Sequence, residues 1–169
     1  MHRRRFLAES VKLALGSSAA SLLSGAISRA ALAETALAEL DEHEARTLTV
    51  LTRAMFPHRA LDDSYYFAVV EQLDRGAAAS GEAREMLRSG IGKLDAAADD
   101  AWIDLPVDDK LRVMEALQTE PFFGAILNQT IDVLYRNPDV WKLVGYEGSS
   151  IEYGGYLNRG FNDIDWLPE

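Results

Sequence analysis

Histidines and closely spaced carboxylates are the residues of this sequence whose types and spacing could carry out chemistry. The three histidines, His2, His43 and His58, are far apart in the chain. A catalytic zinc site usually takes three protein ligands, and only two of these histidines lie beyond the N-terminal segment. We therefore expect His43 and His58 to be surface residues, and we predict no metal site.

Closely spaced aspartates occur at Asp62/Asp63, Asp99/Asp100, Asp108/Asp109 and Asp163/Asp165. Helix starts and turns account for the first three pairs, because aspartate caps helices and favours their positive ends. The fourth pair has the residue types of a general acid and base, but no nucleophile or electrophile accompanies it. The sequence also lacks glycine-rich nucleotide loops and the Gly-x-Ser-x-Gly motif. It predicts no catalytic residue, no cofactor bound by this chain and no enzyme activity of its own.

The amino-acid composition excludes several further classes of function. The chain of 169 residues contains no cysteine, which excludes disulfides, iron–sulfur ligation and covalent c-type haem. Its formal net charge is −10. Residues 1–33 hold five basic residues and one acidic residue, a net +4, which leaves −14 for the remainder. A body this acidic repels phosphate backbones and anionic lipid, so we predict binding to neither nucleic acid nor a membrane surface.

The first 33 residues have the pattern of an export signal. They begin with Arg3-Arg4-Arg5-Phe6-Leu7, which fits the twin-arginine pattern Arg-Arg-x-Phe-Leu. A weakly apolar stretch follows and ends at Ala31-Leu32-Ala33, a small-x-small cleavage site. Ala36-Leu37-Ala38 is a second possible site. We predict a periplasmic protein exported by the twin-arginine route; the alternative is an amphipathic helix with a chance arginine cluster.

Helical signals dominate the rest of the chain, and no stretch alternates with the period of a strand for long. We predict an all-α fold, an irregular bundle of five or six helices over residues 34–144. The expected helices run from Asp41 to Pro57, from Asp62 to a glycine cap at Gly76, from Ser80 through Leu94, from Pro106 through Leu117, from Pro121 to Asn137, and from Pro138 to Val144.

Residues 145–169 form a different kind of segment, rich in glycine and aromatic residues. Its five glycines exclude a regular helix and permit an extended path. Aromatic side chains supply large contact areas. We predict an extended C-terminal arm of the same domain, which either packs on its own bundle or contacts another chain. The residues expected at such a partner interface are Trp141, Tyr146, Tyr153, Tyr156, Arg159, Phe161 and Trp166.

Three motifs of the C-terminal half resemble the gluconate 2-dehydrogenase subunit 3 family. They are Thr119-Glu120-Pro121-Phe122-Phe123, Leu134-Tyr135-Arg136-Asn137-Pro138-Asp139-Val140-Trp141 and Gly145-Tyr146-Glu147-Gly148. The resemblance spans roughly Asp41 to Pro168. Members of that family are small subunits of membrane-associated, FAD-dependent dehydrogenases of sugars, sugar acids and polyols. The resemblance carries no catalytic motif.

The resemblance implies a complex of three subunits. A large flavoprotein of the glucose–methanol–choline oxidoreductase type would hold FAD and oxidise the substrate, and a multihaem cytochrome c would pass electrons to the membrane. This chain would be the non-catalytic accessory subunit, which stabilises the flavoprotein, supplies its export signal and is membrane-associated only through the complex. The alternatives are a stand-alone periplasmic ligand-binding module that uses the aromatic arm, and an enzyme in its own right.

Overall fold

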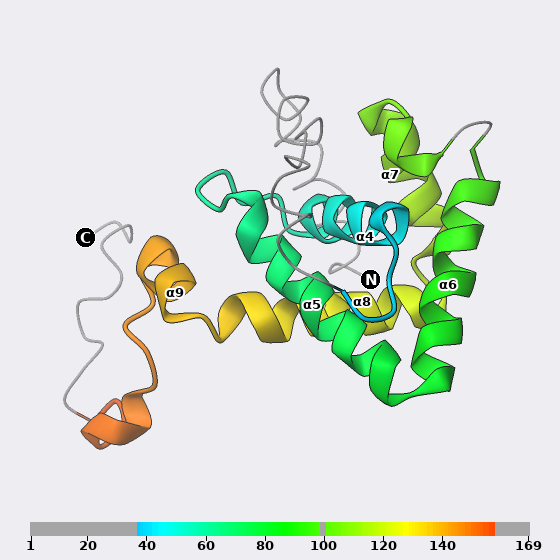
Figure 1. Ribbon diagram of the computed structural model, residues 1–169. Helices are drawn as coiled ribbons and strands as arrows, with labels where there is room; N and C mark the ends of the chain where they lie inside the picture. The colour runs from blue at the N-terminus through cyan, green and yellow to red at the C-terminus, as the bar shows by residue number, and fades with distance from the viewer. Residues whose placement is uncertain (1–36, 99–100, 158–169) are drawn as a thin grey trace. The chain divides into compact units, whose positions relative to one another are not determined.

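Six α-helices and two short 3-10 helices form the part of the chain that the structure describes (Figure 1). The structure is a computed structural model, and it describes residues 37–98 and 101–157. Within these ranges there is no strand, so the predicted all-α fold is confirmed. The α-helices are α4 (Glu42–Met55), α5 (Asp63–Ala79), α6 (Gly81–Ala96), α7 (Val107–Leu117), α8 (Pro121–Tyr135) and α9 (Pro138–Val144), and the 3-10 helices are η1 (Trp102–Asp104) and η2 (Ser150–Tyr153).

Helix α4 begins and ends at the residues that the sequence indicates. The Asp41 carboxylate accepts a 2.8 Å hydrogen bond from the Glu44 backbone N–H, and the Glu44 carboxylate accepts one of 3.0 Å from the Asp41 N–H. This reciprocal capping box satisfies two N–H groups that a helix start otherwise leaves unpaired. The helix ends at Met55, two residues before Pro57.

Helices α5 and α6 meet at Ser80 and diverge from it (Figure 1). Ser80 is both the C-cap of α5 and the N-cap of α6, where its hydroxyl accepts from the Ala83 N–H. The prediction that α5 ends at Gly76 is wrong. A glycine C-cap takes a positive φ, whereas Gly76 does not, and the helix continues through three alanines to Ala79.

A close approach at Gly90 joins α6 to α8. The Phe122 ring lies so near Gly90 that a Cβ built there would be 2.1 Å from Phe122 Cγ. Phe122, Ile126, Thr130 and Leu134 recur every four residues along α8 and are all buried. The sequence also predicts Phe123, Leu127 and Ile131 on this inward face, but the first two are only half-buried and Ile131 is 42% exposed.

Trp102 lies at the centre of the helical core, with no exposed surface. Its backbone N–H donates to Asp95 Oδ1 (3.0 Å), and its indole N–H donates to the Lys110 carbonyl (3.4 Å). Helix η1, which carries Trp102, contacts α4 and α6. Other fully buried side chains include Leu48, Leu51, Tyr66, Val69, Val70, Leu87, Leu94 and Ile126.

The chain forms two compact units, one that ends at Leu134 and one that starts at Tyr135. The second unit contains α9, which ends at Gly145 in the left-handed conformation with φ 75°. No α-helix follows Gly145 in the described residues, as the sequence predicts. The segment is not extended throughout, because η2 forms one 3-10 turn. The second compact unit thus contains both α9 and the described part of the segment that follows Gly145.

Candidate functional site

The two histidines that the sequence predicts at the surface are both partly exposed, and His43 takes part in a polar contact. His43 Nε2 lies 2.8 Å from Asp95 Oδ2, and the other oxygen of Asp95 accepts from the Trp102 N–H. His58 is half-buried in the loop between α4 and α5, and this burial lowers its pKa. Among the residues that the structure describes, no group of three or more potential ligands could hold a metal ion. The pairs Asp99/Asp100 and Asp163/Asp165 lie outside the described residues.

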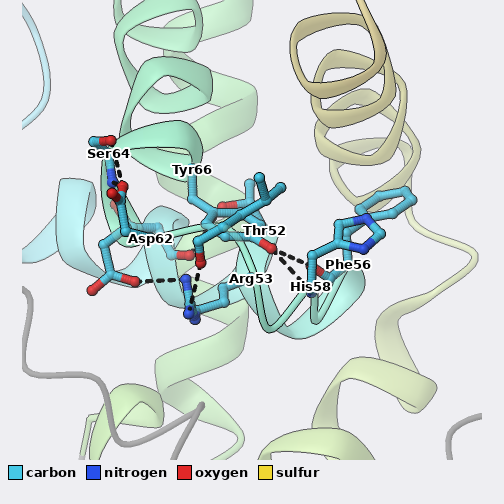
Figure 2. Close-up of polar contacts among 10 residues, drawn as sticks. Thr52, Arg53, Phe56, His58, Asp62, Ser64 and Tyr66 are labelled. Atoms are coloured by element: carbon cyan, nitrogen blue, oxygen red, sulfur yellow. Dashed lines mark hydrogen bonds and ion pairs between the residues drawn. The ribbon is translucent and has the colours of Figure 1, made fainter. Parts of the chain in front are cut away.

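The loop between α4 and α5 contains a dense set of polar contacts around Tyr66 (Figure 2). The Tyr66 hydroxyl donates to the Phe56 carbonyl (2.5 Å) and accepts from the His58 N–H (3.2 Å). The Arg53 guanidinium lies over the Tyr66 ring, 4.9 Å from its centre. These contacts pair buried polar groups with one another.

Arg53 also contacts residues at the end of this loop, where α5 begins (Figure 2). Its Nη2 donates to the Leu61 carbonyl (3.1 Å), and its Nη1 is 2.8 Å from Asp63 Oδ1, at the start of α5. The arginine thus joins the end of α4 to the start of α5. The arrangement fixes the loop between the two helices, so we assign it a structural role.

A second polar cluster holds the segment that follows the predicted signal peptide, and it is our candidate functional site. Asp74 on α5 is buried and accepts hydrogen bonds from three consecutive backbone N–H groups. Asp74 Oδ2 bonds Ala38 at 2.8 Å, and Oδ1 bonds Glu39 and Leu40 at 2.9 Å each. Only 4% of Asp74 is exposed, and Leu40 beside it is also buried.

The protonation state of Asp74 follows from these donors. Burial alone raises the pKa of a carboxyl group, because it disfavours the charged form. The three N–H donors and the nearby Arg75 oppose this effect and exceed it, so the pKa of Asp74 lies below its ordinary value of 3.8. The carboxylate is therefore charged at neutral pH, and its hydrogen bonds are of the stronger, charge-assisted kind.

Two arginines of α6 hold the same segment through Glu39. Arg84 Nη2 is 2.7 Å from Glu39 Oε1, and Arg88 Nη2 donates to the Glu39 carbonyl (3.2 Å). Arg88 also pairs with Glu44 of the α4 capping box. We call Asp74, Arg84 and Arg88 with the segment Ala38–Leu40 the N-terminal anchor. It ties the backbone that leads into α4 to both α5 and α6.

Sequence reasoning overlooked the N-terminal anchor, although one signal of it was present. Asp74 follows Val70 by four residues and precedes Ala77 by three, so it lies on the apolar face of α5. A carboxylate on such a face requires buried donors. The identity of those donors, more than 30 residues earlier in the chain, has no local signature.

The structure describes part of the predicted partner interface. Trp141 and Tyr146 lie together, with ring centres 5.4 Å apart in an edge-to-face arrangement. The Trp141 indole N–H donates to the Tyr135 carbonyl (2.5 Å), and a Cβ built on Gly148 would lie 3.6 Å from the Trp141 ring. The Trp141 side chain is thus held in place by contacts within the C-terminal unit. Arg159, Phe161, Trp166 and the side chain of Tyr153 lie outside what the structure describes.

Large apolar side chains are exposed in the C-terminal unit. Ile151 and Leu157 are more than four-fifths exposed, and Tyr156 is 62% exposed. Single exposed apolar residues are ordinary, but several within one short segment are typical of interaction surfaces. The exposed set in the C-terminal unit is Leu143, Val144, Tyr146, Ile151, Tyr156 and Leu157.

Comparisons with known proteins do not assign a family. No protein family, curated protein or solved structure matches this chain significantly. Of the helices in the described ranges, none has the length and apolarity needed to cross a membrane. The family resemblance in the sequence motifs remains a prediction.

Proposed function

We propose that this chain is the non-catalytic small subunit of a periplasmic, FAD-dependent dehydrogenase. It would stabilise a large flavoprotein of the glucose–methanol–choline type and supply the twin-arginine signal that exports the pair. A multihaem cytochrome c would complete the complex, and FAD and haem would belong to the partners. The proposal rests on the motifs of the C-terminal half and on the Arg3-Arg4 signal.

The observation that carries the proposal is the exposed apolar set of the C-terminal unit. Trp141 in the same unit is held by a hydrogen bond and an aromatic contact, which supports an ordered local structure there. Tyrosine and tryptophan are enriched at the energetic centres of protein interfaces. An exposed apolar set on a chain that is otherwise acidic and free of cysteine suits binding to another protein better than electron transfer or catalysis by this chain.

The proposal is tested first by co-expression with its partner. We expect a neighbouring gene for a large flavoprotein that lacks a signal peptide. Co-expression of both genes should deliver dehydrogenase activity to the periplasm. Replacing Arg3 and Arg4 together with lysine should leave both proteins in the cytoplasm. Export of the flavoprotein in the absence of this chain would contradict the proposal.

Truncation after Gly145 tests whether the arm docks the partner. The predicted interface residues Tyr146, Tyr153, Tyr156, Arg159, Phe161 and Trp166 are all removed by it. We expect a folded, helical small subunit that no longer co-purifies with the flavoprotein. A truncated chain that still retains the flavoprotein would refute docking by the arm, and loss of helical circular dichroism would favour an internal role for it.

A further inference from the structure

We propose that the exported protein is cleaved between Ala33 and Glu34, and that the N-terminal anchor prevents cleavage after Ala38. This inference rests on the proposed export of the chain. In the step, water adds its hydroxyl to the Ala33 carbonyl carbon, the bond to the Glu34 nitrogen breaks, and that nitrogen takes the proton. The sequence alone leaves two sites open, because Ala31-Leu32-Ala33 and Ala36-Leu37-Ala38 both have the small-x-small pattern.

The hydrogen bonds of the anchor distinguish these two sites. Cleavage after Ala38 requires a peptidase to bind the backbone on both sides of the Ala38–Glu39 bond. Such binding is made through main-chain hydrogen bonds to an extended segment. In the folded chain the N–H groups of Ala38, Glu39 and Leu40 already donate to the buried Asp74 carboxylate. A peptidase would have to remove all three donors from Asp74.

The Glu39 side chain adds a second restraint at the same bond. Glu39 would be the first residue after the cut, and Arg84 pairs with its carboxylate while Arg88 binds its carbonyl. The twin-arginine route carries folded proteins, so the anchor would already be formed when the peptidase acts. The Ala33–Glu34 bond lies five residues before the first N–H that Asp74 binds.

Cleavage after Ala38 would also offer Asp74 a new hydrogen-bond donor. Cleavage after Ala38 would create an ammonium group at Glu39, which could pair with Asp74 Oδ1 in place of the amide. That arrangement would leave Asp74 Oδ2 without its donor from Ala38. The intact chain uses both oxygens of the buried carboxylate, so the geometry favours an uncut Ala38–Glu39 bond.

To test this, the full chain is expressed in a bacterium with an active twin-arginine pathway. The N-terminus of the periplasmic protein is then determined by mass spectrometry. The unaltered protein should begin at Glu34 alone. Asp74→Asn should give a second product that begins at Glu39, five residues shorter. Glu71→Gln, a change on the same helix that removes none of the anchor's hydrogen bonds or ion pairs, should give only the product that begins at Glu34.

A second variant keeps the test decisive if Asp74→Asn fails to fold. Arg84→Gln releases the Glu39 side chain and a long hydrogen bond to the Ala77 carbonyl (3.5 Å) but keeps the Asp74 contacts. Arg84 is partly exposed, so we expect the bundle to fold and the shorter product to appear in smaller amount. An unaltered protein that begins at Glu39 would overturn the inference. A folded Asp74→Asn protein with Glu34 as its only N-terminus would overturn the protective role of Asp74. Uncut precursor confined to the cytoplasm would instead overturn the proposed export itself, and this inference with it.

Discussion

Two glycines of α6 are expected to respond to alanine with opposite signs. Gly92→Ala places a methyl group where no atom lies within 4 Å, and Gly92 has no positive φ. Alanine is favoured over glycine in a helix by about 1 kcal/mol, so this variant should be stabilised by roughly 0.5–1 kcal/mol. Gly90→Ala instead places its methyl group 2.1 Å from Phe122 Cγ.

The magnitude for Gly90→Ala follows from what the Phe122 ring must do. Cγ is the atom where the ring joins its side chain, so the ring cannot relieve the overlap by moving its far end. Overpacking of a core costs about 1–3 kcal/mol, and complete loss of a buried phenylalanine costs about 3–5 kcal/mol. We take a cost between these two ranges, about 2–4 kcal/mol, because the overlap falls on Cγ. Subtracting the gain of about 1 kcal/mol in helix propensity leaves a net destabilisation of about 1–3 kcal/mol.

The assay is urea unfolding of the purified protein followed by circular dichroism. A double-mutant cycle isolates the contact, because Gly90→Ala made in a Phe122→Ala background meets no ring. There the same change should stabilise by about 1 kcal/mol, as at Gly92. Equal stabilisation by Gly90→Ala and Gly92→Ala in the unaltered protein would refute the packing of Phe122 on Gly90.

Three further predictions concern polar groups. Because the pKa of Asp74 is lowered in the folded state, its contribution to the free energy of unfolding is complete above its ordinary value of 3.8 and is lost as the pH falls through the lower folded value. Asp74→Asn should therefore be less stable at pH 7. A urea series down to about pH 2–3 should show the difference from the unaltered protein shrinking toward acid; a constant difference would contradict this. Tyr66→Phe removes the hydroxyl that bonds Phe56 and His58, and thermal unfolding should report a loss of about 1–3 kcal/mol; an unchanged midpoint would show that the hydroxyl is dispensable. Ser80→Ala removes a helix cap and should cost about 0.5–2 kcal/mol in the same assay, and a stability gain there would contradict the capping role.

Local chemistry explains which parts of the fold the sequence predicts correctly. The capping box of Asp41 and Glu44, the cap at Asp62 and the glycine at Gly145 act within a few residues, so their types and spacing predict the helix ends. Gly76 failed as a predicted helix end because the alanines after it sustain the helix. A glycine alone does not distinguish a helix end from a helix interior.

Contacts between distant segments account for what the sequence did not predict. The bonds from Asp74 to residues 38–40 span 34 to 36 positions, and His43 meets Asp95 across 52. Nothing near Trp102 indicates that it lies at the centre of the core, because a three-residue 3-10 helix has no periodic pattern. The glycine Gly90 looks unfavourable in a helix, and only the packed ring of Phe122 explains it.

The placement of the tryptophans makes the two compact units separately visible by fluorescence. Trp102 is fully buried in the unit that ends at Leu134, whereas Trp141 is half-buried in the unit that starts at Tyr135. The third tryptophan, Trp166, lies outside the described residues. Replacing Trp141 and Trp166 with phenylalanine leaves a single indole whose emission reports the helical core. In a variant that keeps only Trp141, the emission reports the surroundings of α9. Partner binding and unfolding of the core can then be followed with separate fluorophores.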